Sequence, residues 1–355
     1  MKKTSALILI ILGLTCSGTA SVQPVLTETD GQGHVLSLDR HPERIACLYA
    51  FTGHVTAMLG RGSDMVAIVK GLKKDKLLEK IVPHLSSLPV PSAGGVIHIE
   101  SLIKTRPDIV FLKPETESIA QEVEKLKQFG LPYFSAAYSD MQSQMSVIEA
   151  MGRILNKEKK ALDYTRYYRQ AIARVKDKTD RIADADKLSV YHAINEPFRT
   201  DGPGTLEADW TGACNILNVS VGKGLIEKNR NKRFAGMEQI LMWDPAMIIA
   251  NEAQTAQKIL SDPQWAPIKA VKKGRVFTIP VGISRWGHPG GLETPLAILW
   301  TAKTAYPDLF TDLDLKTEVR QFYQRFFDLG LDDPTIKRIL SGQGMRTTHI
   351  NNPGR

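Results

Sequence analysis

The segment from Asn156 to Ile182 has the pattern of one long helix and divides the chain into two halves. No glycine or proline interrupts it, and its apolar and small side chains recur every three or four residues, with charged side chains on the other faces. Asn156 is a suitable N-cap. At about 1.5 Å per residue the helix would be on the order of 39 Å long, enough to join two lobes. The inward-facing stripe is expected to comprise Leu162, Thr165, Tyr168, Ile172, Val175, Thr179 and Ile182.

Two similar segments stand on either side of this helix. Glu100 is followed seven residues later by Pro107 and then by an apolar run, and Glu238 is followed in the same way by Pro245. Each pattern predicts a short helix that ends before proline and leads into a buried parallel strand. We therefore expect two α/β lobes of similar build, with a ligand cleft between them. The expected boundaries are a lobe over 21–155, a connecting helix over 156–183 and a second lobe over 184–355.

Strand and helix patterns alternate through both halves, which is typical of parallel sheets with right-handed crossovers. Strands are expected near 35–38, 44–49, 65–69, 109–112, 132–136, 189–193, 247–250 and 275–279. Between them we expect a long polar loop from Asn195 to Thr211 and a short helix around Ile216. Ligands of open α/β proteins bind beyond the carboxyl ends of the strands, so the loops there should hold the site.

The first twenty residues have the composition of a secretory signal peptide. Lys2 and Lys3 precede an apolar run that is too short to span a bilayer, and Ala20 ends a group of small residues suited to cleavage. We therefore expect export to the periplasm. The alternative is a lipoprotein, in which Cys16 would be lipidated and would anchor the protein to the membrane.

The basic charge of the chain restricts its partners. A formal net charge of +8 favours an anionic ligand or an anionic membrane surface. The lysines and arginines are scattered apart from one cluster at 228–233, so we expect no nucleic-acid binding. Cys47 and Cys214 lack the spacing of a metal site and are expected to be unpaired core residues. We predict no resident metal and no cofactor.

The loop over residues 281–291 has the most informative composition. Glycine, arginine, tryptophan and histidine crowd between a predicted strand and a predicted helix. Arg285 is expected to pair with an anionic ligand, Trp286 to stack on a planar one, and His288 to hydrogen-bond to the ligand or bind its metal. In the alternative, Trp286 caps the lobe and His288 braces a turn.

Two further loops belong to the predicted rim. Arg199 lies in the polar loop that follows strand 189–193, beside several glycine and proline residues. Tyr49, Phe51 and Thr52 stand where a buried strand meets a helix N-terminus, whose free N–H groups favour an anion. Packing is the alternative role of these aromatic rings. Weaker candidates of the same kind are Lys70, Lys113 and Tyr138.

Catalytic signatures are missing from the sequence. It contains no GxSxG, HExxH or Walker A motif, and no GxGxxG after a strand. We therefore expect a binding protein, and an enzyme on the same scaffold is the least favoured alternative.

Taken in order, these segments resemble the substrate-binding proteins of the ABC importers for ferric siderophores, haem and cobalamin. The resemblance covers nearly the whole chain after the signal, including 42–45, 100–110, 237–245 and 265–276. It implies two Rossmann-like lobes joined by one rigid helix, capture of an anionic metal chelate in the cleft, and docking on a membrane permease. The chain departs from the family pattern at Phe51-Thr-Gly-His54, where members often carry Ser or Pro with Thr-Glu.

The resemblance also ranks the ligands. An iron(III)–siderophore complex leads because it represents the largest ligand class of that family. The alternatives are an oxyanion such as molybdate or tungstate, favoured by Arg285, His288 and the helix N-termini, and haem or cobalamin. Glu100 and Glu238 match the glutamates with which members engage arginines of the permease, although both also suit helix N-termini electrostatically. A monomer is expected.

Overall fold

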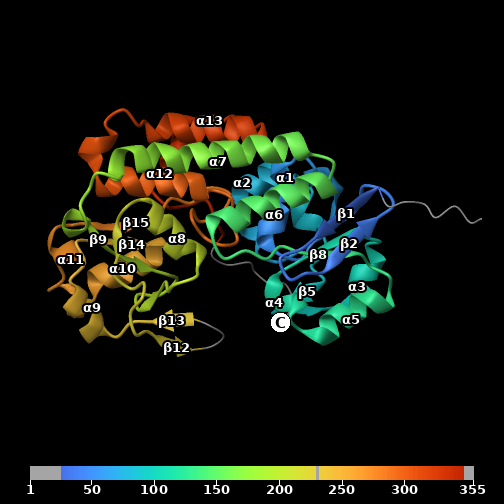
Figure 1. Ribbon diagram of the computed structural model, residues 1–355, viewed down its shortest axis with the longest axis horizontal. Helices are drawn as coiled ribbons and strands as arrows, with labels where there is room; N and C mark the ends of the chain where they lie inside the picture. Colours follow the sequence, from blue (N-terminus) through green and yellow to red (C-terminus); the bar gives the residue numbers. More distant parts are fainter. Residues whose placement is uncertain (1–24, 229–231, 348–355) are drawn as a thin grey trace, which may run out of the picture.

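Two parallel four-stranded sheets form the centres of two lobes in the computed structural model, which describes residues 25–228 and 232–347 (Figure 1). Lobe one has the strand order β4-β3-β7-β8, and lobe two has the order β11-β9-β14-β15. The first sheet comprises β3 (Ile45–Cys47), β4 (Met65–Ile68), β7 (Ile109–Leu112) and β8 (Tyr133–Ser135). The second comprises β9 (Ser189–Ala193), β11 (Leu217–Asn218), β14 (Met247–Ala250) and β15 (Val276–Thr278). The predicted fold class is confirmed.

The repeated segments occupy equivalent places in the two sheets. Helix α3 (Ile99–Lys104) leads into β7, and α9 (Met237–Trp243) leads into β14. The residue before each proline has a positive φ, 45° at Arg106 and 38° at Asp244. A residue before proline is disfavoured in the right-handed helical region, so both helices end there. Every residue of β7 and β14 is buried, as expected for strands covered on both faces.

Helix α7 (Glu158–Thr179) spans both lobes along one side of the molecule (Figure 1). Tyr168 and Val175 are buried as predicted, but Leu162 is 39% exposed and Tyr164 is buried in its place. Asn156 does not cap this helix. Its φ of 55° ends the preceding helix α6 (Met141–Ile154), because asparagine tolerates the left-handed conformation that a helix C-terminus requires.

Short helices and two antiparallel ribbons complete lobe one. Strand β2 (Val35–Leu38), expected at a sheet edge, pairs with β1 (Leu26–Thr29) in a separate ribbon, and β5 (Ser92–Ala93) pairs with β6 (Val96–Ile97). The helices are α1 (Ala50–Met58), α2 (Lys76–Ile81), α4 (Pro114–Glu117), α5 (Ala120–Gln128) and α6, with 3₁₀ turns at Gly62–Asp64, Leu72–Lys74 and Leu85–Ser87.

Lobe two differs from prediction between its first two sheet strands. The expected loop from Asn195 to Thr211 contains β10 (Arg199–Thr200) and most of α8 (Leu206–Ala213), which begins there because the Thr205 hydroxyl accepts from the Ala208 N–H at 3.2 Å. The prediction of a helix around Ile216 is wrong, because the residues that follow Ile216 form β11 and pair in parallel with β9. An unpredicted hairpin follows, made of β12 (Ile226–Lys228) and β13 (Lys232–Phe234).

The remaining helices of lobe two are α10 (Ala253–Ser261), α11 (Lys269–Lys272), α12 (Thr294–Ala305), α13 (Leu315–Phe327) and α14 (Asp333–Leu340), with 3₁₀ turns at Asp184–Asp186, Pro263–Trp265 and Pro307–Phe310. After α14 the chain returns to lobe one. The Lys76 N–H donates to the Met345 carbonyl at 3.2 Å, and the Thr347 N–H donates to the Lys74 carbonyl at 3.0 Å. This C-terminal segment is therefore a second connection between the lobes.

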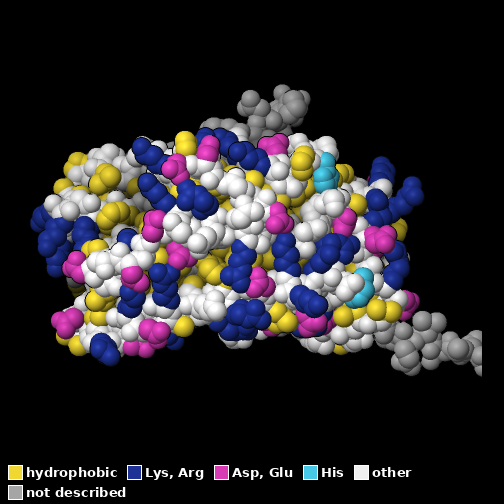
Figure 2. All heavy atoms as spheres, turned by 90° about the horizontal axis from the view of Figure 1, so that it is seen from above, with side chains coloured by type: hydrophobic (Ala, Val, Ile, Leu, Met, Phe, Trp, Pro, Cys, Tyr) yellow, Lys and Arg dark blue, Asp and Glu magenta, His cyan; other side chains and the backbone are white. Residues whose placement is uncertain are grey.

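Charges of both signs cover the face that carries α7. Figure 2 shows lysine and arginine side chains spread over this face with acidic side chains among them. Several are paired, as in the contact of Arg325 Nη2 with Asp163 Oδ1 at 2.6 Å. No helix in the described part of the chain combines the length and apolar character of a membrane span. The predicted signal peptide lies outside the described residues.

Candidate functional site

The loops at the carboxyl ends of the two sheets meet each other directly. The hydroxyl of Tyr49, which precedes α1 in lobe one, donates to the Pro289 carbonyl of lobe two at 3.0 Å. The Tyr138 hydroxyl contacts the same carbonyl and lies 3.1 Å from the Tyr49 hydroxyl. Nearby, Nδ1 of His54 donates to the Gly290 carbonyl at 2.8 Å. The predicted loop over 281–291 therefore faces the predicted Tyr49 turn across the lobe boundary.

A cavity of 540 Å³ opens on the lobe-one side of this boundary. Its wall includes residues that follow β3, β4 and β7, where ligands of open α/β sheets bind. Lys70 and Lys113, two of the weaker candidates, contribute positive charge, although Lys113 Nζ also pairs with Glu115 at 2.8 Å. Tyr49 lines the cavity as well as contacting lobe two, so the cavity adjoins the loop that carries Arg285.

Arg285 is the centre of a polar cluster on the facing rim of lobe two. Only 14% of its side chain is exposed, and its Nη1 donates to Asn195 Oδ1 and, at 2.6 Å, to Glu252 Oε1. Asn195 and Glu252 lie just beyond β9 and β14, and Arg285 lies beyond β15, so three strand ends supply the cluster. Burial, followed by the nearby Arg346, lowers the pKa of Arg285. Its Nε is buried without a partner.

His288 extends this cluster towards lobe one. Its Nδ1 lies 2.9 Å from the Gly290 nitrogen, whose N–H is directed at it. Burial, and then the charge of Arg285, hold the pKa of His288 well below its usual value, which keeps the ring neutral. Nε2 lies 2.9 Å from Arg285 Nη2, which can only donate, so both ring nitrogens face N–H groups although a neutral ring accepts at only one of them. An anion beside this pair would supply the acceptor that one of these N–H groups lacks.

Sequence analysis missed a buried cluster below this rim. His192 Nδ1 lies 2.9 Å from Asp201 Oδ2, and Asn218 Nδ2 donates to the same oxygen at 3.0 Å. Burial opposes protonation of His192, but Asp201 outweighs it and raises the pKa. Burial and then Asp201 raise the pKa of Glu207 to about 7. The available signal was a histidine within β9, near the carboxyl end of that buried strand.

The structure divides the predicted ligand residues into two groups. Arg285, His288 and Tyr49 lie at the lobe boundary, and Arg199 is close enough to lower the pKa of His288. The other three are buried in the core of this structure, and their assignment as direct ligand contacts stays a prediction. These are Phe51 and Thr52, both 0% exposed, and Trp286, which is 1% exposed.

The two predicted docking glutamates are both accessible. Glu100 and Glu238 are exposed and occupy the second position of α3 and of α9. Figure 1 shows these helices on the outer flanks of the two lobes, away from α7. The carboxylates are therefore free to meet a partner that bridges both lobes.

Comparison with known proteins finds relatives that bind small ligands. Molybdate-binding protein MolA of Haemophilus influenzae is 26% identical over 358 residues, which cover 92% of this chain and 97% of MolA. The vitamin B12-binding protein of Vibrio campbellii is 22% identical, with 64% and 76% covered. In solved structures, MolA bound to molybdate superposes with a TM-score of 0.76 at 20% identity, covering 86% of this chain and 99% of MolA.

Other solved structures share the fold. CeuE of Helicobacter pylori with Ni(II) bound superposes with a TM-score of 0.71 at 20% identity, covering 89% of this chain and 99% of CeuE. The family model described as periplasmic binding protein matches residues 45–281. This chain therefore belongs to the periplasmic binding protein family and is a non-enzymatic, substrate-binding component of an ABC importer.

Proposed function

We propose that this protein captures a small oxyanion such as molybdate or tungstate in the cleft between its lobes and delivers it to the permease of an ABC importer. The observation that carries this proposal is the buried guanidinium of Arg285 on the lobe-two rim, whose Nε has no partner and whose Nη2 lies 2.9 Å from His288 Nε2. The oxygens of a tetrahedral anion accept hydrogen bonds in that geometry, and a buried guanidinium gains from a negative partner that offsets its desolvation.

Charge around the rim favours the same class of ligand. Arg199 and Arg346 both act on the pKa of His288, and Lys70 and Lys113 line the cavity on the opposite lobe. Glu252 accepts a hydrogen bond from Nη1 of Arg285. An anion would therefore bind along the other edge of the guanidinium group, which carries Nε and Nη2. A site with this many positive groups discriminates against neutral ligands.

The ranking of ligands consequently differs from that drawn from sequence. The similarity to MolA over nearly the whole chain supports an oxyanion, and we place it ahead of an iron(III)–siderophore complex. Haem and cobalamin rank lower because the predicted stacking residue, Trp286, is buried in the core. The Tyr49 and Tyr138 contacts with Pro289 also hold the lobes together where a large planar ligand would need space.

Delivery requires a surface that both lobes present to the permease. Glu100 and Glu238 fit this role, since they are exposed, acidic and equivalently placed on α3 and α9. Carboxylates pair well with arginine side chains on a partner. The same residues also stabilise their own helices by lying in the first turn, and the two roles are compatible.

Isothermal titration of the purified protein with molybdate, tungstate, sulfate and a ferric siderophore tests the proposal. We expect saturable binding of molybdate or tungstate, and none of the ferric chelate. Metal analysis and an absorption spectrum of protein purified from its native host provide an independent check, because a ferric chelate, haem or corrinoid absorbs visible light and molybdate does not. Visible absorption from a retained chelate, with no binding of either oxyanion, would overturn the assignment.

A further inference from the structure

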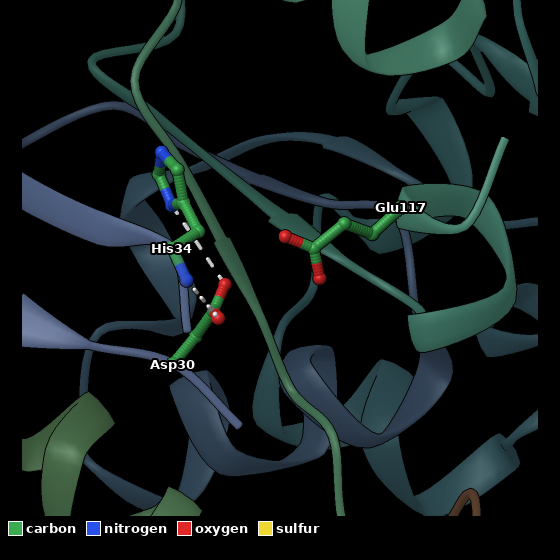
Figure 3. A group of neighbouring side chains, drawn as sticks. All are labelled: Asp30, His34 and Glu117. Carbon is green, nitrogen blue, oxygen red and sulfur yellow. Dashed lines mark hydrogen bonds and ion pairs between the residues drawn. The ribbon is translucent and has the colours of Figure 1, made fainter. Parts of the chain in front are cut away.

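Three potential metal ligands that the oxyanion site does not use lie together in lobe one (Figure 3). One donor atom each from Asp30, His34 and Glu117 lies within 4.8 Å of the others. Asp30 and His34 flank the turn of the β1–β2 ribbon, and Glu117 ends α4, just beyond β7. Figure 3 shows the Glu117 carboxyl group pointing towards the other two side chains. No sequence motif marks this group, because Glu117 is far from the other two residues along the chain.

Asp30 supplies a fixed carboxylate to this group. Its side chain is fully buried, and Oδ1 accepts from the N–H groups of Gln32 and His34, each at 3.0 Å. Oδ2 accepts from the Ser135 N–H at 3.1 Å. Hydrogen bonds from three backbone N–H groups therefore hold this carboxyl group in one orientation.

His34 presents a nitrogen to this carboxyl group. Its ring is stacked on Tyr133 with centroids 3.9 Å apart and an angle of 14° between the planes, which fixes its orientation. Nδ1 is buried, makes no hydrogen bond and lies 3.7 Å from Asp30 Oδ2. An imidazole nitrogen without a proton is a common metal ligand in proteins.

Glu117 and Ser135 complete the group with further unsatisfied atoms. Oε2 of Glu117 is buried without a partner, and so is Oγ of Ser135, a residue that is 0% exposed. Two acids close together, beside an imidazole and a hydroxyl that lack partners, are unusual in a protein interior. A cation between them would satisfy all of these groups.

We propose that Asp30, His34 and Glu117 bind a divalent first-row transition-metal ion such as Zn²⁺. Two carboxylates and one imidazole nitrogen match the oxygen and nitrogen ligands that such ions accept. In a tetrahedral site with bonds of about 2.1 Å, the donor atoms stand about 3.4 Å apart. The Asp30 to His34 distance of 3.7 Å is close to that spacing, and rotation of the Glu117 side chain brings in the third ligand. Water or the Ser135 hydroxyl takes the fourth position.

The ion would brace one wall of the ligand cavity. It would tie the β1–β2 ribbon to α4. The cavity is lined by Lys113, which precedes this helix, and by Thr116 within it. The site is separate from the Arg285 cluster on lobe two and does not depend on the identity of the transported ligand. Its metal is a resident ion that stabilises lobe one.

Zinc titration of chelator-treated protein, in competition with a chromogenic chelator, tests the site. We expect one equivalent to bind and the melting temperature to rise. His34→Ala and Glu117→Gln should each weaken binding at least tenfold and abolish the rise in melting temperature. Glu117→Gln keeps the shape of the side chain and removes one of two adjacent acids, so it should remain folded, as circular dichroism will verify.

Matched controls are His84→Ala and Glu115→Gln, which change the same residue types elsewhere in lobe one. Both should bind zinc like the parent. The proposal is overturned if the chelator-treated parent binds no zinc, if folded Glu117→Gln binds it as the parent does, or if binding is lost only in His288→Ala, which would place the ion in the cleft. None of these outcomes bears on oxyanion binding, which is measured separately by calorimetry.

Discussion

His54 in lobe one donates a hydrogen bond from Nδ1 to the backbone carbonyl of Gly290 in lobe two, at 2.8 Å. Its Nε2 lies 3.0 Å from Asp75 Oδ2, and Asp75 Oδ1 in turn lies 3.2 Å from Arg346 Nε of the C-terminal segment. The imidazole is therefore held from one side by lobe two and from the other by Asp75. The departure at Phe51–His54 thus lies at a contact between the lobes.

This contact predicts the effect of removing the imidazole. His54→Ala should lower the free energy of unfolding by about 3–5 kcal/mol, because it leaves the buried Asp75 carboxylate without its nearest partner. Urea unfolding followed by circular dichroism measures the change. His84→Ala, a histidine nearer the surface of the same lobe, should stay within about 0.5 kcal/mol of the parent. If both variants lose the same free energy of unfolding, the His54 contacts do not stabilise the fold.

Arg285 is expected to dominate oxyanion affinity. Arg285→Ala should weaken molybdate or tungstate binding by on the order of 2–5 kcal/mol, because a buried charge pair with the ligand is lost. His288→Ala should weaken it less, since one neutral hydrogen bond is worth about 0.5–1.5 kcal/mol. Arg320→Ala, an arginine 43% exposed on α13, is the matched control and should leave affinity unchanged. If both rim variants bind like the parent, the site lies elsewhere.

Glu207 predicts a stability change that depends on pH. Because its pKa is raised to about 7 in the folded protein, the folded state holds this proton more tightly than the unfolded state does. Its contribution is therefore complete below pH about 4.5 and is lost as the pH rises through 7. Glu207→Gln should raise the free energy of unfolding by about 1–3 kcal/mol at pH 8 and change it little at pH 4.5.

Denaturant unfolding of Glu207→Gln at the two pH values, with the exposed Glu124→Gln as control, makes this measurement. The difference between variant and parent isolates Glu207 from the other groups that titrate in this range. A difference that is the same at both pH values would mean that Glu207 ionises normally in the folded protein.

Permease docking predicts a separation of transport from binding. Glu100→Lys combined with Glu238→Lys should abolish ligand-dependent uptake in cells that carry the cognate transporter, because the charges that meet the permease are reversed. Molybdate affinity of the purified variant should not change, since both residues are exposed on the outer flanks of the lobes. The matched control reverses two exposed glutamates off these helices, Glu115 and Glu124. Normal uptake by the Glu100 and Glu238 variant would exclude the docking role.

Export predicts the mass of the mature chain. If the first twenty residues are a signal peptide, the protein from the envelope fraction should begin at Ser21. A chain that begins at an acylated Cys16 would establish the lipid anchor instead. Intact-mass spectrometry distinguishes the two, and a chain that retains Met1 would rule out both.

Much of the architecture could be predicted from sequence because its causes are local. Hydrophobic periodicity predicted α7, and the steric demand of Pro107 and Pro245 predicted where α3 and α9 end before their strands. Because the carboxyl ends of parallel strands share one edge, the sequence also indicated that the Arg285 loop and the Tyr49 turn face a common cleft. The hairpin after β11 escaped prediction because its short, polar strands carry no periodic signal.

Only the tertiary structure decided which side chains of those loops reach the cleft. Trp286 and Phe51 have the composition of ligand-stacking residues, yet both are buried, because a local pattern does not state on which side of a loop the core lies. Contacts between residues far apart in the chain were likewise invisible, as with Arg285 and Asn195. The metal-ligand group of lobe one has the same origin, since Glu117 meets Asp30 and His34 only after the β1–β2 ribbon packs against the end of the first sheet.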